Sequence, residues 1–143
     1  MLPISTEHVI ADRLRLMEDC RKKLFDAERI YDDVSEPILH DYSLIPYLYR
    51  VFCDITGEER LKGETREVFV FLVVYLYAPG CLDNIKLPPH LRMAIANVLD
   101  IRAASVLSRI KESIVFRYEL YFHDKAEDIF ALMVNRLMED GYL

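Results

Sequence analysis

Five side chains in the middle of the 143-residue chain are of the types that contact nucleic acids. At 100° per residue, Ser105, Ser108 and Arg109 fall on one face of a helix that we expect to begin near residue 104. Hydroxyls can hydrogen-bond to base edges, and a guanidinium can grip guanine with two hydrogen bonds. Arg102, just before the helix, and Lys111, on its flank, are suited to phosphate oxygens. The pattern predicts nucleic-acid recognition and assigns no catalytic residue.

The other face of this expected helix is apolar and should pack against the rest of the protein. It consists of Val106, Leu107, Ile110, Ile114, Tyr118 and Tyr121. Glu112 lies on the polar face, yet residues 102–117 hold four basic side chains against this single acid, a local net charge of +3. After Ile114 apolar residues occur on several sides, namely Val115, Phe116, Leu120 and Phe122. This distribution predicts that the C-terminal half of the helix is buried.

A preceding helix, ending near Leu99, would position this face through a tight turn. Apolar residues occupy the positions at which two helices joined by such a turn pack together: Ile95, Leu99, Ile101, Val106 and Ile110. Ala96 falls where the two helices come closest and only a small side chain fits. Asp100 takes the turn position, because aspartate tolerates left-handed backbone better than most residues.

The run IANVLDIRAASVLSRI, residues 95–110, resembles the helix-turn-helix of bacterial sigma-factor region four and of response-regulator effector domains. An apolar–Ala pair, a turn and a Ser/Thr-Val-x-x-Arg-apolar run recur in that family. The likeness covers about 20 residues, and it departs from the family at Asp100, usually glycine, and at Leu107, usually polar. The resemblance implies a small DNA-binding protein, a transcriptional regulator of bacterial or phage type. The N-terminal half of the second helix would enter the major groove.

A second group of residues has the chemistry of a metal site. His40-Asp41, with His8 upstream, resembles the His-Asp motif of HD-domain metal phosphohydrolases, in which a divalent metal activates water. Four histidines and 12 aspartates yield such pairs by chance, and His123-Asp124 is a second pair. The sequence also contains no Gly-rich phosphate loop and no nucleophile motif. We therefore expect no metal, no cofactor and no enzymatic activity. The phosphohydrolase stays a remote alternative.

The N-terminal part of the chain predicts a long helix capped by Ser5 or Thr6. Its apolar residues form one narrow stripe: Ile10, Leu14, Met17, Leu24 and Tyr31. Such a stripe suits a partner helix, either from the same chain or from a second copy. We therefore expect packing within the chain or a homodimer formed through this helix.

The remaining segments predict further helices. Residues 32–46 read as a connector, followed by a short helix over 45–55 that Gly57 ends. Residues 68–77, VFVFLVVYLY, have the composition of a strand. We interpret them as a buried helix from near Thr65, because the chain offers no second strand to pair with them. Asp124 and Glu127 form a capping box for a last helix.

Together these segments predict an all-α bundle of about six helices that contains a helix-turn-helix unit and a long N-terminal helix. Residues 1–60 form the N-terminal segment and residues 61–143 the helix-turn-helix-like core, in one compact domain. The longest apolar run, 68–78, is too short for a membrane span. No secretion signal is visible, and the three widely spaced cysteines, Cys20, Cys53 and Cys81, fit reduced thiols in a cytoplasmic protein.

The charge balance leaves a second class of function open. A net charge of −6 excludes a protein that coats nucleic acid over its whole surface, whereas residues 61–121 carry +2 and could hold a local site. The alternative is a helical protein-interaction or scaffolding module that binds no nucleic acid.

Overall fold

The computed structural model describes residues 9–22, 35–83 and 86–143, and within these ranges the fold is all-helical, with no strand. The α-helices are α1 (Val9–Lys22), α3 (Ile45–Thr56), α4 (Gly63–Tyr77), α5 (Pro89–Leu99), α6 (Ala104–Arg117) and α7 (His123–Glu139). Two 3-10 turns, η1 (Tyr42–Leu44) and η2 (Pro79–Leu82), and one π-helical turn, η3 (Tyr118–Phe122), connect them. The all-α prediction is confirmed.

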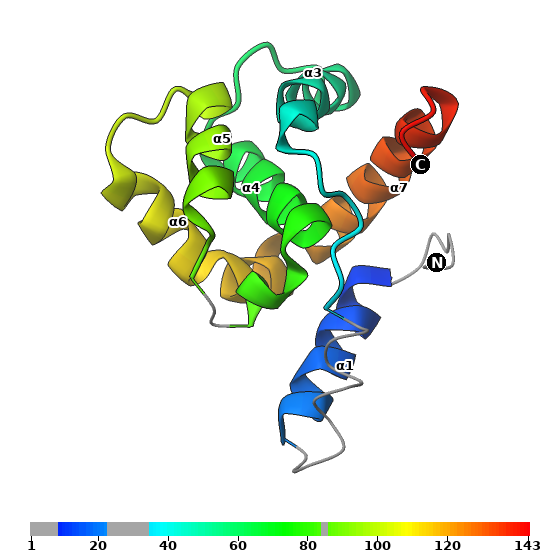
Figure 1. Ribbon diagram of the computed structural model, residues 1–143, viewed down its shortest axis with the longest axis vertical. Helices are drawn as coiled ribbons and strands as arrows, with labels where there is room; N and C mark the ends of the chain where they lie inside the picture. Colours follow the sequence, from blue (N-terminus) through cyan, green and yellow to red (C-terminus); the bar gives the residue numbers. More distant parts are fainter. Residues whose placement is uncertain (1–8, 23–34, 84–85) are drawn as a thin grey trace.

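Helix α4 is the centre of the bundle (Figure 1), where α3, α5, α6 and α7 contact it. Every side chain from Val68 to Tyr77 is buried, so this ambiguous segment is the buried helix that we expected. A helix that is apolar on all sides is stable only when neighbours cover it completely. Its rings pack edge-to-face against other helices, with centroids 5.3 Å apart for both Phe69–Phe52 and Tyr75–Phe130.

Helix α3 follows its predicted bounds and helps to enclose α4. Pro46 stands in its first turn, and Gly57 ends it with left-handed backbone, φ +74°, a conformation that glycine adopts without strain. Before it, the predicted connector is held against the end of α4. The N–H groups of Ile38 and Leu39 both donate to the carbonyl of Leu76, at 2.8 and 3.0 Å.

Helix α1 extends from one side of the bundle (Figure 1) and buries part of its apolar stripe within the chain. Ile10 and Met17 are fully covered, and Leu14 is half-buried against the core. This favours packing inside the chain over a dimer for the described part of the stripe. The other residues of that prediction lie outside the described residues: Ser5, Thr6, Leu24 and Tyr31.

The helical path from α6 through η3 into α7 corrects the predicted burial pattern. Tyr121, expected in the buried stripe, is 62% exposed, whereas Phe122 is 1% exposed. A π-helical turn holds more residues than an α-helical turn, so η3 shifts the register and turns Phe122 inward in place of Tyr121. Phe116 and Leu120 are also exposed, so the prediction of a buried C-terminal half was wrong for them.

The predicted capping box of the last helix was also wrong. Because η3 leads directly into α7, Asp124 caps nothing and lies beside His123 instead. Glu127 is buried, and its Oε1 accepts hydrogen bonds from the N–H groups of Ile10 (2.9 Å) and Ala11 (3.1 Å). The carboxylate therefore caps the beginning of α1, a helix 117 residues away in sequence.

The core joins both predicted segments, since residues of α1 and α3 belong to the same hydrophobic cluster as α4 and α7. No helix in the described ranges is both long and apolar enough to cross a membrane. The cysteines Cys20, Cys53 and Cys81 form no disulfide.

Candidate nucleic-acid interface

A short turn between α5 and α6 orients the predicted contact residues. Asp100 follows the last residue of α5 with left-handed backbone, φ 54° and ψ 41°. Its N–H donates to the carbonyl of Asn97 at 3.3 Å, and the next N–H, of Ile101, donates to Ala96 at 2.9 Å. These bonds use the free carbonyls at the end of α5, as a Schellman-type ending does. The predicted turn at this position is confirmed.

Buried side chains fix α6 against the bundle and leave its other face outward. Leu107 and Ile114 are completely covered, and Ile110 is almost so. Helices α6 and α4 are in contact along this seam. Leu107 is part of the hydrophobic core. The resemblance would have placed a polar side chain at this position.

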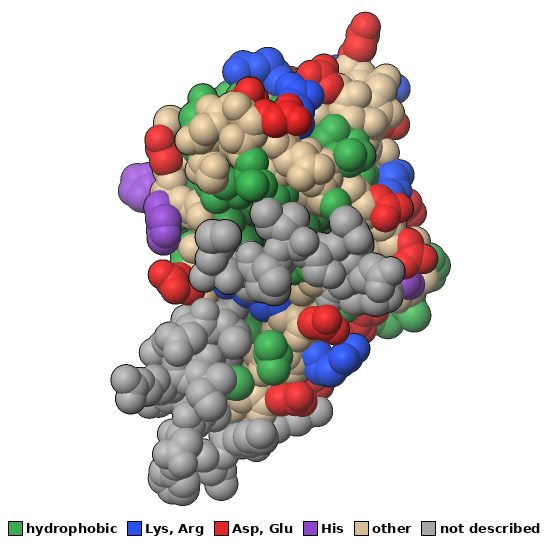
Figure 2. Space-filling model, turned by 90° about the vertical axis from the view of Figure 1, so that its right-hand side faces the viewer, with side chains coloured by type: hydrophobic (Ala, Val, Ile, Leu, Met, Phe, Trp, Pro, Cys, Tyr) green, Lys and Arg blue, Asp and Glu red, His purple; other side chains and the backbone are tan. Residues whose placement is uncertain are grey.

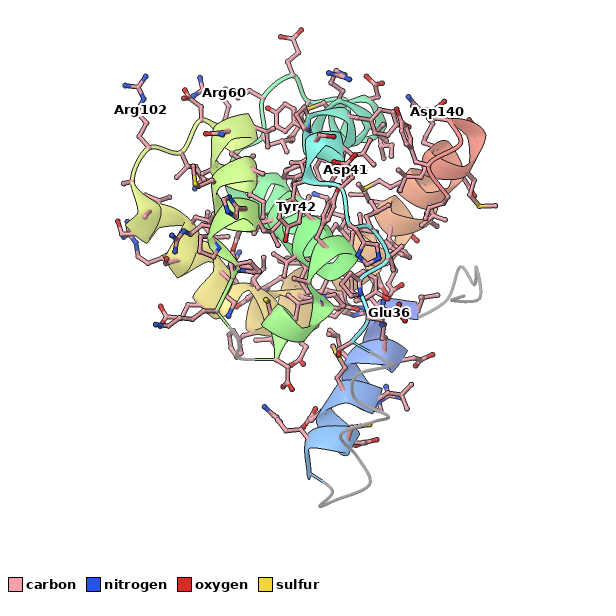
Figure 3. All side chains as sticks on the ribbon, in the orientation of Figure 1. Glu36, Asp41, Tyr42, Arg60, Arg102 and Asp140 are labelled. Atoms are coloured by element: carbon pink, nitrogen blue, oxygen red, sulfur yellow. The ribbon has the colours of Figure 1, made fainter. Side chains whose placement is uncertain are left out.

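Four of the five predicted contact residues are exposed at the start of α6. They are Arg102, Ser105, Ser108 and Arg109, and Figure 3 shows Arg102 projecting away from the bundle at the turn. Arg109 Nε donates to the carbonyl of Ser105 at 3.4 Å, so its side chain lies along the helix. Among the described residues, no carboxylate forms an ion pair with Arg102 or Arg109. Both guanidinium groups are therefore available to a ligand.

Two of the five predicted residues, the exposed Ser108 and the half-buried Lys111, border a groove of about 850 Å³ between α1, η2, α5 and α6. Lys111 is half-buried and lies near Cys81. Burial raises the pKa of the Cys81 thiol, and the charge of Lys111 opposes that rise. Of the predicted set, only Lys111 is therefore withdrawn from the exposed surface into the groove.

The excess of positive charge is concentrated in this part of the sequence. Residues 86–111 hold five basic side chains and one acid, a net charge of +4, so the rest of the chain carries −10. The five are Lys86, Arg92, Arg102, Arg109 and Lys111. By contrast, the face shown in Figure 2, on the side of α7 and α1, intermixes acidic and basic side chains. Arg102 and Arg109 are exposed outside the groove, whereas the other three bases line it beside four acidic side chains: Glu18, Asp83, Glu112 and Glu119.

A buried polar cluster that attaches α1 to the bundle was not predicted. Tyr118 donates its hydroxyl to Glu127 Oε1 at 3.1 Å, beside the two α1 N–H groups. Arg13, only 5% exposed, lies over the Tyr75 ring at 5.3 Å from its centroid and donates to the carbonyl of Glu36. Burial raises the pKa of Tyr75 and of Tyr118. The cluster positions a helix. Its one signal in the sequence was Glu127, an acid next to the apolar residues of the last helix.

The His-Asp pair has a structural role at Asp41. Its carboxylate accepts hydrogen bonds from the N–H (2.9 Å) and the hydroxyl (2.6 Å) of Ser43, which cap η1 and lower the Asp41 pKa. His8 lies outside the described residues. Within them, no group of three or more His, Cys, Asp or Glu side chains is placed to hold a metal ion.

Comparisons with protein-family models, with curated proteins and with solved structures find no match to this chain. The surface at the start of α6 offers two guanidinium groups, a hydroxyl and the first turn of a helix with no side-chain cap.

Proposed function

We propose that the chain is a small DNA-binding protein of the helix-turn-helix kind that inserts the first half of α6 into the major groove. The observation that carries the proposal is the pair of exposed arginines, Arg102 and Arg109, at the start of α6 within a segment of charge +4. Their guanidinium groups have no ion-pair partner among the described residues. On a chain whose remainder carries −10, this is the surface that a polyanion would approach.

The dimensions of α6 support this placement. A helix with its side chains is about 10–12 Å wide, and the major groove of B-DNA is about 12 Å wide. Ser105 and Arg109 stand one helical turn apart on the same face, about 6 Å along the axis, which spans roughly two base pairs. Arg109 would grip a guanine, and Ser105 would bond to a neighbouring base or to the backbone.

The surroundings of α6 supply phosphate contacts. Arg102 projects from the turn, and the first N–H groups of α6 have no side-chain cap, as at helix termini that bind phosphate. Ser108 and Lys111, at the groove beside α1, would meet the backbone on that flank. Because Lys111 is half-buried, we expect a smaller contribution from it than from Arg102. The resemblance of residues 95–110 favours a transcriptional regulator of bacterial or phage type, acting in the cytoplasm, without a cofactor or catalysis.

Fluorescence anisotropy with a labelled duplex of about 30 base pairs of mixed sequence tests the proposal. Non-specific contacts with about four phosphates predict an affinity that falls roughly 100-fold between 50 and 200 mM salt. Arg102→Ala should weaken binding and lower the salt slope by about one unit. Arg50→Ala is the matched control, because Arg50 is an exposed arginine on α3, beside Asp54 and Arg136, away from α6.

Arg109→Ala separates base contacts from phosphate contacts. Selection of bound duplexes from a random pool should yield a preferred sequence for the unaltered chain. With Arg109→Ala the preference at one position should relax, at a cost of about 1–3 kcal/mol for the preferred site. Absence of binding at 50 mM salt, or equal losses for Arg109→Ala and Arg50→Ala, would overturn the proposal.

A second candidate function, a protein-interaction module, is favoured by a different part of the same helix. Phe116, Leu120 and Tyr121 are large apolar side chains that remain exposed beyond the cationic segment. This second function is supported if the chain does not bind duplex DNA and if substitutions at these three residues release a protein partner.

A further inference from the structure

Three exposed apolar side chains form a surface at the junction of α6 and η3, which we name the Phe116 patch. Phe116 is 62% exposed, Leu120 58% and Tyr121 62%. From Phe116, Leu120 is four residues away and Tyr121 five, which is about one turn of the α-helix and of the π-helix respectively. The three side chains therefore lie next to one another on one side of the helical path.

The π-helical turn creates this patch. An uninterrupted α-helix would have placed Tyr121 on the buried stripe with Ile114 and Tyr118. Instead Phe122 fills the core, stacking edge-to-face on Phe71 at 5.9 Å, and Tyr121 is released to the surface. π-helical turns are rare and often occur at functional sites.

The Tyr121 ring is held in place. The guanidinium of Arg117 lies 5.1 Å from the centroid of the Tyr121 ring, and Arg117 is itself ion-paired with Glu67 of α4. An aromatic ring fixed in this way loses little conformational entropy on binding, so it suits a contact surface.

The charge around the patch matches a second copy of itself. Apart from Lys111, which faces the groove near Cys81, residues 109–124 hold two basic and three acidic side chains, a net charge of −1. The basic ones are Arg109 and Arg117, and the acidic ones are Glu112, Glu119 and Asp124. An interface around a twofold axis must complement itself, as an apolar centre with a rim of both charge signs does. A polyanion gains nothing from a surface with this slight excess of acid.

The size of the patch determines what else a dimer must cover. The exposed parts of the three side chains amount to roughly 300–350 Å², whereas a stable interface buries about 800 Å² on each partner. A circular interface of that area has a radius of about 16 Å. Arg109 lies seven residues before Phe116 on the same face, about 10 Å along the axis, and so falls within the interface.

We infer that the Phe116 patch is the contact between two copies of this chain, and that this dimer and duplex DNA exclude each other. The dimer is inferred from the patch alone, whereas the exclusion of DNA rests on the proposed function. The dimer covers Arg109, which DNA needs, so it is the DNA-free form. The dimer contact therefore lies on α6 and η3 instead of on the N-terminal helix that the sequence suggested.

Sedimentation equilibrium of the full chain from 1 to 500 μM tests the first part. We expect a shift from 16.8 kDa to twice that mass. The association should strengthen from 50 to 500 mM salt, because the contact is apolar and salt screens the repulsion between two chains of charge −6. Phe116→Asp and Leu120→Asp should each weaken it at least tenfold. Leu132→Asp, at a 50% exposed leucine of α7, should leave it unchanged.

A chain that stays monomeric at 500 μM, or a dimer that Phe116→Asp and Leu132→Asp weaken equally, would overturn the dimer. Unchanged circular dichroism confirms that each exposed-site variant is folded.

The duplex used for anisotropy then tests whether DNA and the dimer exclude each other. DNA should dissociate the dimer, and Phe116→Asp should bind DNA as tightly as the unaltered chain at 1 μM and more tightly at 500 μM. DNA that binds the intact dimer contradicts the exclusion, whereas a dimer with no DNA binding contradicts the proposed function alone.

Discussion

Replacing Glu127 by alanine tests how α1 is attached to the bundle. The carboxylate is 6% exposed, and its Oε1 accepts three hydrogen bonds, from the N–H groups of Ile10 and Ala11 and from the hydroxyl of Tyr118. Alanine removes the acceptor and leaves all three donors without a protein partner. An unsatisfied buried donor costs about 1–3 kcal/mol, and loss of a helix cap about 0.5–2 kcal/mol.

The magnitude follows from how deeply each donor is buried. The Ile10 N–H and the Tyr118 hydroxyl are buried, whereas the Ala11 N–H is partly buried and can regain water. We therefore expect Glu127→Ala to lower the free energy of unfolding by about 3 kcal/mol. Glu127→Gln keeps an acceptor oxygen without the charge and should cost about 1 kcal/mol.

Urea unfolding monitored by circular dichroism measures these differences, and hydrogen exchange locates them. Amides of α1 should lose protection in Glu127→Ala before those of α4 do, because α1 loses its cap while the core stays packed. Glu139→Ala, at an exposed acid of the same helix, should change stability by less than about 0.5 kcal/mol. A loss below about 1 kcal/mol for Glu127→Ala, or unchanged exchange in α1, would refute this account of the attachment.

Two further predictions concern the turn at Asp100 and Tyr47 of α3, whose hydroxyl bonds to Asp140 at the end of α7. Because Asp100 has φ 54°, Asp100→Gly should raise the free energy of unfolding by about 0.5–1 kcal/mol and Asp100→Val should lower it by about 1–2 kcal/mol in urea unfolding. Burial and the hydrogen bond to Asp140 raise the pKa of Tyr47 to about 12. The neutral phenol is favoured in the folded state, so its stabilisation is complete below pH 10 and is lost as the pH rises from 10 to 12. Absorbance at 295 nm should show several late-titrating tyrosines, and Asp140→Asn should shift one of them to lower pH; an unchanged titration curve would contradict the assignment.

The sequence was sufficient for the parts of the fold in which one strong pattern decides the outcome. Residues 68–77 are apolar on every side, and the absence of a second strand favoured a buried helix over a strand. The turn at Asp100 and the end of α3 at Gly57 follow from local backbone preferences, which act within a few residues. The exposure of Ser105 and Arg109 follows from helix periodicity alone.

The features that sequence reasoning missed depend on contacts between distant segments. Tyr121 and Phe122 are adjacent aromatic residues, and only packing against Phe71 selects which one enters the core and so produces the π turn. Asp124 and Glu127 have the spacing of a cap, yet Glu127 bonds to α1 because the bundle brings that helix beside it. Lys111 lies at a groove whose far wall is α1, a neighbour that periodicity within α6 cannot reveal.

A nitrogen–proton correlation spectrum of the labelled chain, titrated with duplex DNA at 50 mM salt and low protein concentration, measures directly which surface the ligand covers. Amide shifts should concentrate in residues 100–112, with the turn and the first half of α6 changing most. Shifts confined to residues 116–121, or shifts scattered over α7 and α3, would contradict DNA binding through the start of α6.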